Sequence, residues 1–171
     1  TRRNYDREHV NARWQELRDN HPEVYSDETL SKDTLNDDYQ QLFVAMLLDH
    51  VQHVITCLND KTQPEPLRLL LLGTAGSGKT RAVQTALQEI QRTLAAAGLP
   101  LDVEPRDFVR VAAPTGSAAF NLRFHATTVH RLIHWFTPPY FKTITDDKTL
   151  YELHKQLRST QLVILDEVSM I

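Results

Sequence analysis

Segments with apolar side chains at helical spacing alternate along this chain with short, continuous apolar runs. After Asn36, a residue type that favours a helix N-cap, apolar side chains recur three and four positions apart as far as Ile55, which predicts a long helix. A nearly continuous apolar run over 67–72 then ends at Gly73, as is typical of a parallel strand buried on both faces. A second amphipathic helix is predicted over 78–97, with one apolar stripe turned inward.

Two more strands are predicted farther along the chain. Residues 108–113 and 162–165 are short apolar runs, and a short helix is expected over 117–122. Residues 124–147 are expected to be mostly loop and short helix, with one more helix before the last strand. Since strands alternate with helices, the predicted fold class is α/β, with a parallel sheet covered on both faces. Ligands bind at the carboxyl ends of the strands in such sheets.

The start of the chain is more polar and less regular. Residues 1–34 are interpreted as an accessory N-terminal segment, with a short polar helix over 5–20. Residues 35–171 are interpreted as the main domain. The chain begins with Thr1 rather than Met, so we expect it to start inside a longer protein.

Composition narrows the classes of protein to which the chain can belong. Its 171 residues suit one domain with a short appendage, and a net charge of −3 argues against a polybasic nucleic-acid binder. That charge does not exclude a DNA motor whose strand-binding groove is shared between domains. Cys57 is the only cysteine, so no internal disulfide can form, and a reducing intracellular compartment is expected. No uninterrupted apolar stretch approaches the roughly 20 residues of a membrane span, so no membrane partner is expected.

One segment fits the phosphate-loop pattern G-x-x-x-x-G-K-[ST] at every position. Its residues are Gly73, Thr74, Ala75, Gly76, Ser77, Gly78, Lys79 and Thr80. Glycines let the backbone N–H groups curl around phosphate oxygens, and the following helix adds the positive end of its dipole. Lys79 is expected to reach the β- and γ-phosphates of ATP, and the Thr80 hydroxyl to bind Mg²⁺. The predicted strand before the segment and the helix after it favour this interpretation over a chance Gly/Ser turn.

An acidic pair, Asp166-Glu167, follows the last predicted strand. Asp166 is expected to hold Mg²⁺, and Glu167 to polarise the water that attacks the γ-phosphate. The alternative is a solvated acidic turn, which the phosphate loop elsewhere in the chain makes less favoured. A neighbouring Glu suits water activation, so the pair predicts ATP hydrolysis rather than transfer to a small-molecule acceptor.

Four motifs occur in an order that resembles one family of helicases. They are the phosphate loop, Ala113–Ala119, Thr127–His130 and Asp166–Met170. In this order they resemble the Pif (petite integration frequency) family of superfamily-one 5′-to-3′ DNA helicases, which includes the helicase part of Helitron transposons; RecD-type helicases are more distant. The resemblance spans roughly residues 35–171. The Ala-Pro-Thr-Gly and Asp-Glu-Val-Ser-Met stretches are more specific than the phosphate loop.

The resemblance implies a RecA-like ATPase domain, and it implies DNA contacts. The positions that match strand-binding segments of the family are Pro114, Thr115, Gly116, Thr128 and His130. Backbone amides and small hydroxyls at a strand end can hold phosphates without reading base identity. The chain departs from the family at Ser117, where a Lys is usual, so one basic contact is missing.

The adenine-reading motif of the family also departs here. It often reads Leu-Asn-x-x-Gln, whereas Leu35-Asn36 is followed by Tyr39 at the Gln position and by Gln40 one place later. Gln40 is the candidate adenine contact, with stacking by Tyr39 as an alternative. A further alternative is that Gln40 and Gln41 are plain helix-surface residues.

The interpretation with most support is the ATP-binding and ATP-hydrolysing motor domain of a DNA helicase, with ATP and Mg²⁺ as cofactors and single-stranded DNA as partner. Such a protein would act in DNA repair or recombination, in the nucleus or mitochondrion of a eukaryote or otherwise in the cytoplasm. A P-loop small-molecule kinase and a non-catalytic, strand-binding fragment of a mobile element are the alternatives. Because the chain stops at Ile171, just after its acidic pair, a second RecA-like domain is expected to be missing. The arginine finger of that domain would be missing with it, so the fragment alone is expected to hydrolyse ATP slowly.

An aromatic cluster surrounds Pro138-Pro139. Its members are Trp135, Phe136, Tyr140 and Phe141. They could stack on bases, or they could pack within a loop.

Overall fold

The computed structural model describes residues 6–20, 35, 37–97, 99, 105–134 and 147–170. The chain forms two compact units, which are Thr1–Pro100 (unit 1) and Leu101–Ile171 (unit 2). The aromatic cluster around Pro138-Pro139 and the whole stretch 21–34 lie outside the described residues.

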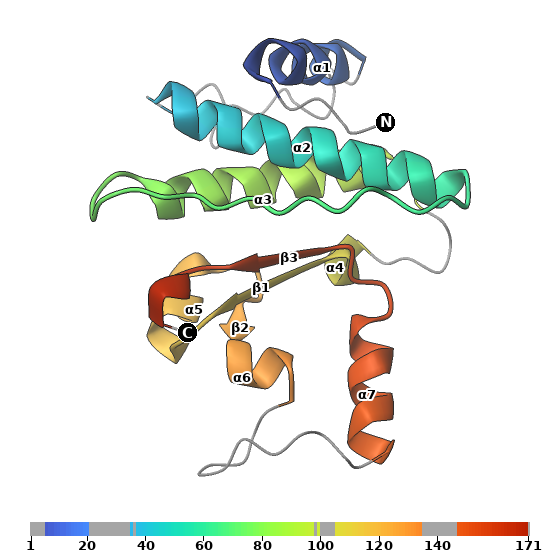
Figure 1. Ribbon diagram of the computed structural model, residues 1–171, viewed down its shortest axis with the longest axis vertical. Coiled ribbons are helices and arrows are strands. Elements are labelled where there is room, and N and C mark those ends of the chain that lie inside the picture. The colour runs from blue at the N-terminus through green and yellow to red at the C-terminus, as the bar shows by residue number, and fades with distance from the viewer. Residues whose placement is uncertain are drawn as a thin grey trace. The chain divides into compact units, whose positions relative to one another are not determined.

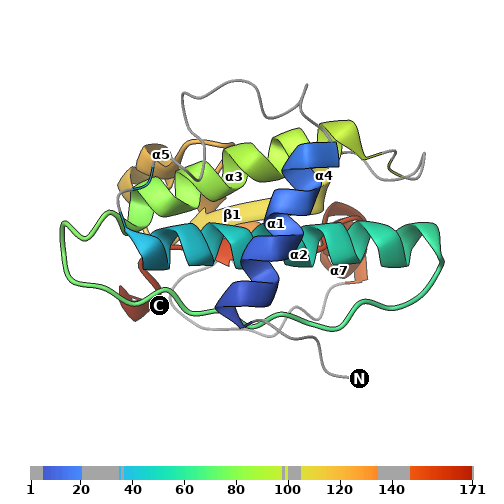
Figure 2. The same cartoon turned by 90° about the horizontal axis from the view of Figure 1, so that it is seen from above.

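Unit 1 is helical in the described residues. It contains α1 (Arg7–Asn20), α2 (Asp38–Asn59) and α3 (Lys79–Ala96). The helices α2 and α3 run side by side in the same direction (Figure 1), and α1 crosses α2 (Figure 2). Two helices that run in the same direction need a long connection, and the chain between them returns along the pair from the end of α2 to the start of α3 (Figure 1). The first residues of α2 and of α3 therefore lie at the same end of the unit.

The predicted long helix is confirmed as α2, but its N-cap was assigned to the wrong residue. Asp37 is the N-cap, since its side chain accepts hydrogen bonds from the backbone N–H groups of Tyr39 and Gln40. A carboxylate at this position satisfies two otherwise unpaired donors and interacts favourably with the helix dipole. Asn36, the residue favoured by the sequence, lies outside the described residues. Cys57 is buried in this helix.

By length and composition α2 could cross a membrane, and it is the one helix among the described residues that passes this test. More than half of its most apolar window is nevertheless buried inside the chain. It also carries the buried Asp49, whose carboxylate is paired with the Arg13 guanidinium of α1. A buried ion pair to a neighbouring helix is a feature of a core helix packed within its own protein.

The second predicted helix is confirmed as α3. Its inward positions were expected to be apolar, and Val83, Leu87, Ile90 and Leu94 are all buried. These positions recur three and four apart, so they lie on one face of the helix. The helix spans Lys79–Ala96, within one residue of the predicted range 78–97 at each end.

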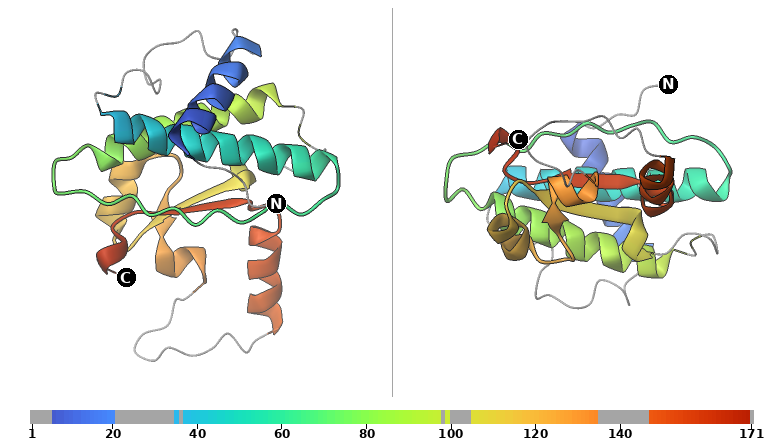
Figure 3. Two further views of the ribbon diagram at one scale, coloured as in Figure 1. Left: turned by 45° about the horizontal axis from the view of Figure 1, so that its top comes forward. Right: turned by 90° about the horizontal axis from the view of Figure 1, so that it is seen from below.

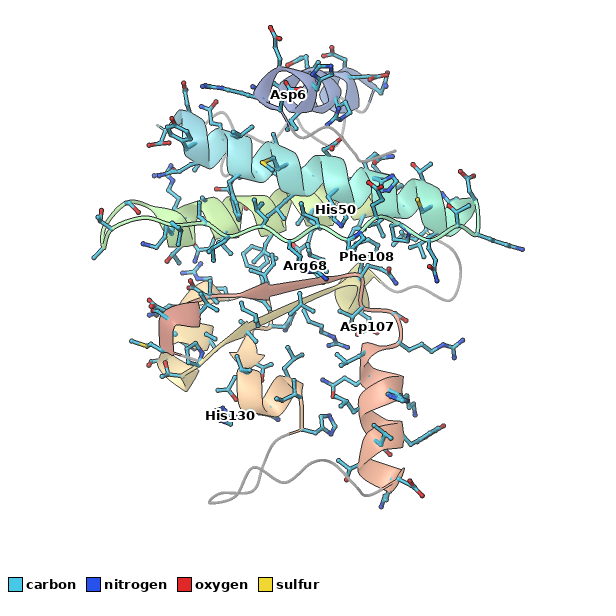
Figure 4. The ribbon with its side chains drawn as sticks, in the orientation of Figure 1. Asp6, His50, Arg68, Asp107, Phe108 and His130 are labelled. Atoms are coloured by element: carbon cyan, nitrogen blue, oxygen red, sulfur yellow. The ribbon has the colours of Figure 1, made fainter. Side chains whose placement is uncertain are left out.

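The strand predicted over 67–72 is wrong. The segment has no secondary structure and makes no ladder within the described residues; Leu70 is 64% and Leu72 79% exposed. It forms part of the long return connection on which Arg68 is labelled in Figure 4. Apolar residues favour an extended backbone, but a strand forms only where another strand supplies hydrogen-bond partners. That pairing depends on distant residues, so the local pattern could not predict it.

Unit 2 contains a three-stranded parallel sheet in the order β2-β1-β3. Its strands are β1 (Val109–Ala113), β2 (Thr127–Thr128) and β3 (Leu162–Leu165). Figure 3 shows β1 and β3 side by side, with the last helix of the unit leading into β3. The other elements are α4 (Pro105–Phe108), α5 (Gly116–Leu122), α6 (Val129–Leu132), α7 (Asp147–Leu157) and the 3₁₀ turn η2 (Val168–Met170).

The parallel sheet and its intervening helices confirm the predicted α/β class. Consecutive residues Val111, Ala112 and Ala113 are all buried, so β1 is covered on both faces, as expected. In β3 the positions Val163 and Leu165 are exposed, so that strand is not covered on both faces. The sequence did not predict β2, because two residues are too few to show a period.

Candidate functional site

The phosphate-loop segment Gly73–Thr80 joins the extended connection to the start of α3. Its backbone turns sharply at Gly76 and at Gly78, each with φ of +79°. Glycine adopts this left-handed conformation freely, whereas residues with a Cβ are strained there. The two glycines therefore let the chain curl before the helix begins, as the sequence pattern predicts.

Lys79 is the first residue of α3, and its side chain lies over the phosphate loop. Its Nζ donates hydrogen bonds to the carbonyl oxygens of Gly73, at 2.7 Å, and Thr74, at 2.8 Å. The ammonium group is thus held against the curled backbone by two neutral acceptors. Phosphate oxygens carry more negative charge than carbonyls and bind an ammonium more strongly. The loop and its lysine accordingly fit the triphosphate of a nucleotide.

The structure brings Gln40 to the phosphate loop from the first turn of α2. Its Nε2 donates to the carbonyl oxygen of Ser77 at 2.7 Å. The approach is close enough that a Cβ added at Gly78 would lie 2.7 Å from the same nitrogen. The neighbouring Gln41 donates from its own amide to the Leu35 carbonyl oxygen.

Both glutamines are therefore hydrogen-bonded to other segments of unit 1. The alternative that Gln40 and Gln41 are helix-surface residues without a nucleotide contact stays a hypothesis. Tyr39 is 77% exposed. The contact from Gln40 to the Ser77 carbonyl was not predicted, because it depends on the two helix starts meeting. Adenine recognition by Gln40 or Tyr39 stays a prediction.

The predicted Mg²⁺ ligands come from the two units. The Thr80 side chain is exposed in the first turn of α3. Asp166 follows β3, and its Oδ1 accepts a hydrogen bond from the Glu167 backbone N–H at 2.9 Å. A hydroxyl and a carboxylate are oxygen ligands of the kind that Mg²⁺ prefers. Thr80 belongs to unit 1 and Asp166 to unit 2, so a shared ion between them stays a prediction.

Glu167 has an unusual backbone for a residue with a side chain. Its φ is +52°, in the left-handed region, and the residue is exposed. Such a conformation costs about 1–2 kcal/mol for an L-residue. Residues held in strained conformations cluster at functional sites. The geometry turns the chain abruptly after Asp166 and leaves the Glu167 carboxylate open to solvent.

Three predicted motifs meet at the carboxyl edge of the sheet in unit 2. The last residue of β1, Ala113, pairs in register with Thr128 of β2, and Pro114 follows it directly. On the other side of β1, the Asp166 backbone N–H donates to the Ala112 carbonyl oxygen at 2.9 Å. The register thus places the acidic pair, the Ala-Pro-Thr-Gly stretch and the Thr-Thr-Val-His stretch together. Ligands of parallel α/β sheets bind at this edge.

Two threonines at this edge have a structural role that the sequence analysis missed. The Thr115 Oγ1 accepts a hydrogen bond from the Ala118 N–H and caps α5, and the Thr128 Oγ1 accepts from the Arg131 N–H and caps α6. A Thr followed three residues later by a helical N–H is a capping signal that could have been found. The Thr128 hydroxyl still has its own hydrogen to donate to a ligand, whereas the Thr115 Oγ1 also lies 3.3 Å from the Ser117 Oγ.

The remaining strand-binding candidates are accessible. Gly116 and the N-cap Thr115 are exposed, and His130 projects from α6 into solvent (Figure 4). Their contact with DNA stays a prediction. Among the described residues no group of three His, Cys, Asp or Glu side chains could hold a metal ion.

Comparison with known proteins identifies the kind of domain. A family model described as an AAA domain matches residues 59–171, which include the phosphate loop and the acidic pair. No curated protein and no solved structure matches the chain. The family match and the three-stranded parallel sheet fit an α/β RecA-like fold with a nucleotide-binding P-loop. The chain belongs to this AAA domain family of P-loop NTPases.

Proposed function

We propose that the chain is the ATP-hydrolysing motor domain of a 5′-to-3′ DNA helicase of the Pif type. The observation that carries the proposal is the edge of the sheet in unit 2. There the acidic pair lies beside two segments, Pro114–Gly116 and Thr127–His130, whose sequences resemble strand-binding motifs of those helicases. A domain that couples ATP hydrolysis to movement along DNA must connect its hydrolytic groups rigidly to its strand-binding groups. The edge of one sheet provides this connection.

Nucleotide binding rests on the phosphate loop. On binding ATP, Lys79 exchanges its two carbonyl partners for β- and γ-phosphate oxygens, and the loop N–H groups surround the phosphates. Gln40 holds the Ser77 carbonyl and so steadies the loop from α2. Thr80 and Asp166 would each supply an oxygen ligand to Mg²⁺, which would neutralise phosphate charge.

Hydrolysis rests on Glu167. Its exposed carboxylate accepts a proton from the attacking water as the water oxygen bonds to the γ-phosphorus. The bond from the γ-phosphorus to the β–γ bridging oxygen breaks, and ADP leaves with that oxygen. The Glu167 backbone N–H donates a hydrogen bond to the Asp166 carboxylate. The turn that this bond closes fixes the direction of the two side chains relative to each other. No acceptor other than water is required, which separates this reaction from that of a kinase.

Nucleotide binding is tested by replacing Lys79 with Ala. A charged contact to phosphate contributes about 1.5–3 kcal/mol, so the affinity for a fluorescent ATP analogue should fall about ten- to a hundredfold. Lys155→Ala is the matched control, since it removes an exposed lysine of α7 far from the loop in sequence. Equal affinity of the Lys79→Ala variant and the parent would remove nucleotide binding at this loop.

Strand binding is tested by replacing Thr128 and His130 together with Ala. We expect weaker binding to a single-stranded oligonucleotide at a stated salt concentration and unchanged affinity for the ATP analogue. A Thr128→Ser, His130→Ala variant keeps the cap of α6 and separates loss of structure from loss of contact. The strand-binding assignment fails if the double-alanine variant binds the oligonucleotide as tightly as the parent.

A further inference from the structure

One large aromatic ring in unit 2 lies in water. Phe120 of α5 is 83% exposed, the largest exposed fraction of any big apolar side chain in the described residues. Two other α5 residues, Ala119 and Leu122, are buried. Phe120 therefore lies on the outer face of the helix, together with Gly116 and Ser117, which are four and three residues before it. Scattered exposed apolar residues are common, so the surroundings decide what this ring does.

The sequence on either side of the ring lacks acidic residues. From Phe108 to Thr145 the sequence contains no Asp or Glu, although the whole chain has 22 of them and a net charge of −3. Within the described part of that stretch, Arg123 and Arg131 are exposed. Arg123 follows Phe120 by three residues, and Arg131 lies on α6. Because α5 and α6 both pack against β2, the ring and the two guanidinium groups belong to one region of the unit.

The chain between α5 and β2 takes a strained path. Arg123, Phe124 and His125 all have positive φ, between +51° and +61°, and the Ala126 N–H closes the turn onto the Arg123 carbonyl oxygen at 2.9 Å. Three consecutive L-residues in this conformation are costly, at about 1–2 kcal/mol each. The result is an exposed arginine and an exposed histidine directly after the helix that carries the ring.

We propose that Phe120 is a base-stacking residue for single-stranded DNA, and that Arg123 and Arg131 bind the phosphates on either side of the stacked base. The inference rests on the proposed function and deepens it, since the strand-binding segments Pro114–Gly116 and Thr127–His130 do not include these residues. An aromatic ring stacks on any base, because every base has a π-face, so it suits a motor that moves along DNA of any sequence. Exposed arginines on a segment without acidic residues attract the phosphate backbone and do not favour an apolar protein partner.

The test compares the 171-residue chain with its variants on two fluorescein-labelled oligomers of about 15 nucleotides, within the span of such binding sites. One oligomer is oligothymidylate and the other is an abasic strand with the same number of phosphates. Binding is measured by anisotropy over a range of salt concentrations. Phe120→Ala should bind oligothymidylate about tenfold more weakly and the abasic strand unchanged. Phe120→Trp should bind both oligomers as the parent does.

Three further variants separate the ring from its surroundings. Tyr151→Ala removes another exposed aromatic ring, on α7 of the same unit, and should leave both affinities unchanged. Arg123→Gln and Arg131→Gln should each weaken binding to both oligomers and reduce the salt dependence by about one released counterion.

Several results would overturn the inference. The inference fails if Phe120→Ala binds oligothymidylate as tightly as the parent does. It also fails if the variant loses as much affinity for the abasic strand as for oligothymidylate. If Phe120→Ala instead dissociates a dimer of the parent in sedimentation velocity, the ring binds a second copy and not a base. When the parent binds oligothymidylate but is insensitive to Phe120→Ala, this inference fails and the proposed function stands. When the parent binds neither oligomer, the strand-binding half of the proposed function fails as well.

Discussion

Replacing Gly78 with Ala should destabilise the nucleotide-free chain more than the same change at Gly76. Both glycines have φ of +79°, so an added Cβ costs about 1–2 kcal/mol of strain at either position. At Gly76 nothing lies within 4 Å of the added Cβ, whereas at Gly78 it would lie 2.7 Å from the Nε2 of Gln40. The end of the Gln40 side chain must then move and give up its hydrogen bond to Ser77.

The difference between the two variants measures that one contact. A typical intramolecular hydrogen bond contributes about 0.5–1.5 kcal/mol, so Gly78→Ala should lower the free energy of unfolding by about 2–3 kcal/mol and Gly76→Ala by about 1–2 kcal/mol. Alanine also restricts the unfolded chain, but this effect is the same at both positions and cancels in the comparison.

Urea unfolding followed by circular dichroism measures both values, and a double-mutant cycle identifies the cause. In a Gln40→Ala background the amide is gone, so Gly78→Ala should cost no more than Gly76→Ala does. The expected coupling between Gln40 and Gly78 is about 1 kcal/mol. Equal losses for the two glycine variants in the parent, or full additivity in the cycle, would refute the role of Gln40 as a contact of the phosphate loop.

Two further predictions concern the acidic pair and the first helix. In the intact protein Glu167→Gln should keep the affinity for ATP and slow single-turnover hydrolysis about 10²–10⁴-fold, because an amide cannot accept the proton of the attacking water; near-parental turnover would show that another group is the base. Arg13→Ala should lower the free energy of unfolding by about 3 kcal/mol, because it removes the guanidinium paired with Asp49, whose side chain is 2% exposed. Arg7→Ala, which breaks an exposed pair between α1 and Asp38 of α2, should cost about 1 kcal/mol or less, and equal losses in urea unfolding would contradict this reasoning.

Local information in the sequence was sufficient for the helices and for the phosphate loop. Apolar side chains at helical spacing predicted α2 and α3 within a few residues of their observed bounds, because this periodicity depends on neighbours within one or two turns. The two left-handed turns of the loop also follow from local chemistry, since glycine alone adopts them without strain. The acidic pair was found at the end of β3 for a similar reason: a short apolar run that ends in charged residues marks where a strand leaves the core.

Tertiary structure decided which segments pair and which side chains meet. The apolar run over 67–72 looked like a strand, but it lies extended without a ladder, because hydrogen-bond partners come from distant parts of the chain. The register of Ala113 with Thr128 and the contact of Gln40 with the phosphate loop depend on packing between elements, which no local pattern encodes. The exposure of Phe120 is decided in the same way, since an apolar residue on a short helix is expected to be buried until the faces of that helix are known.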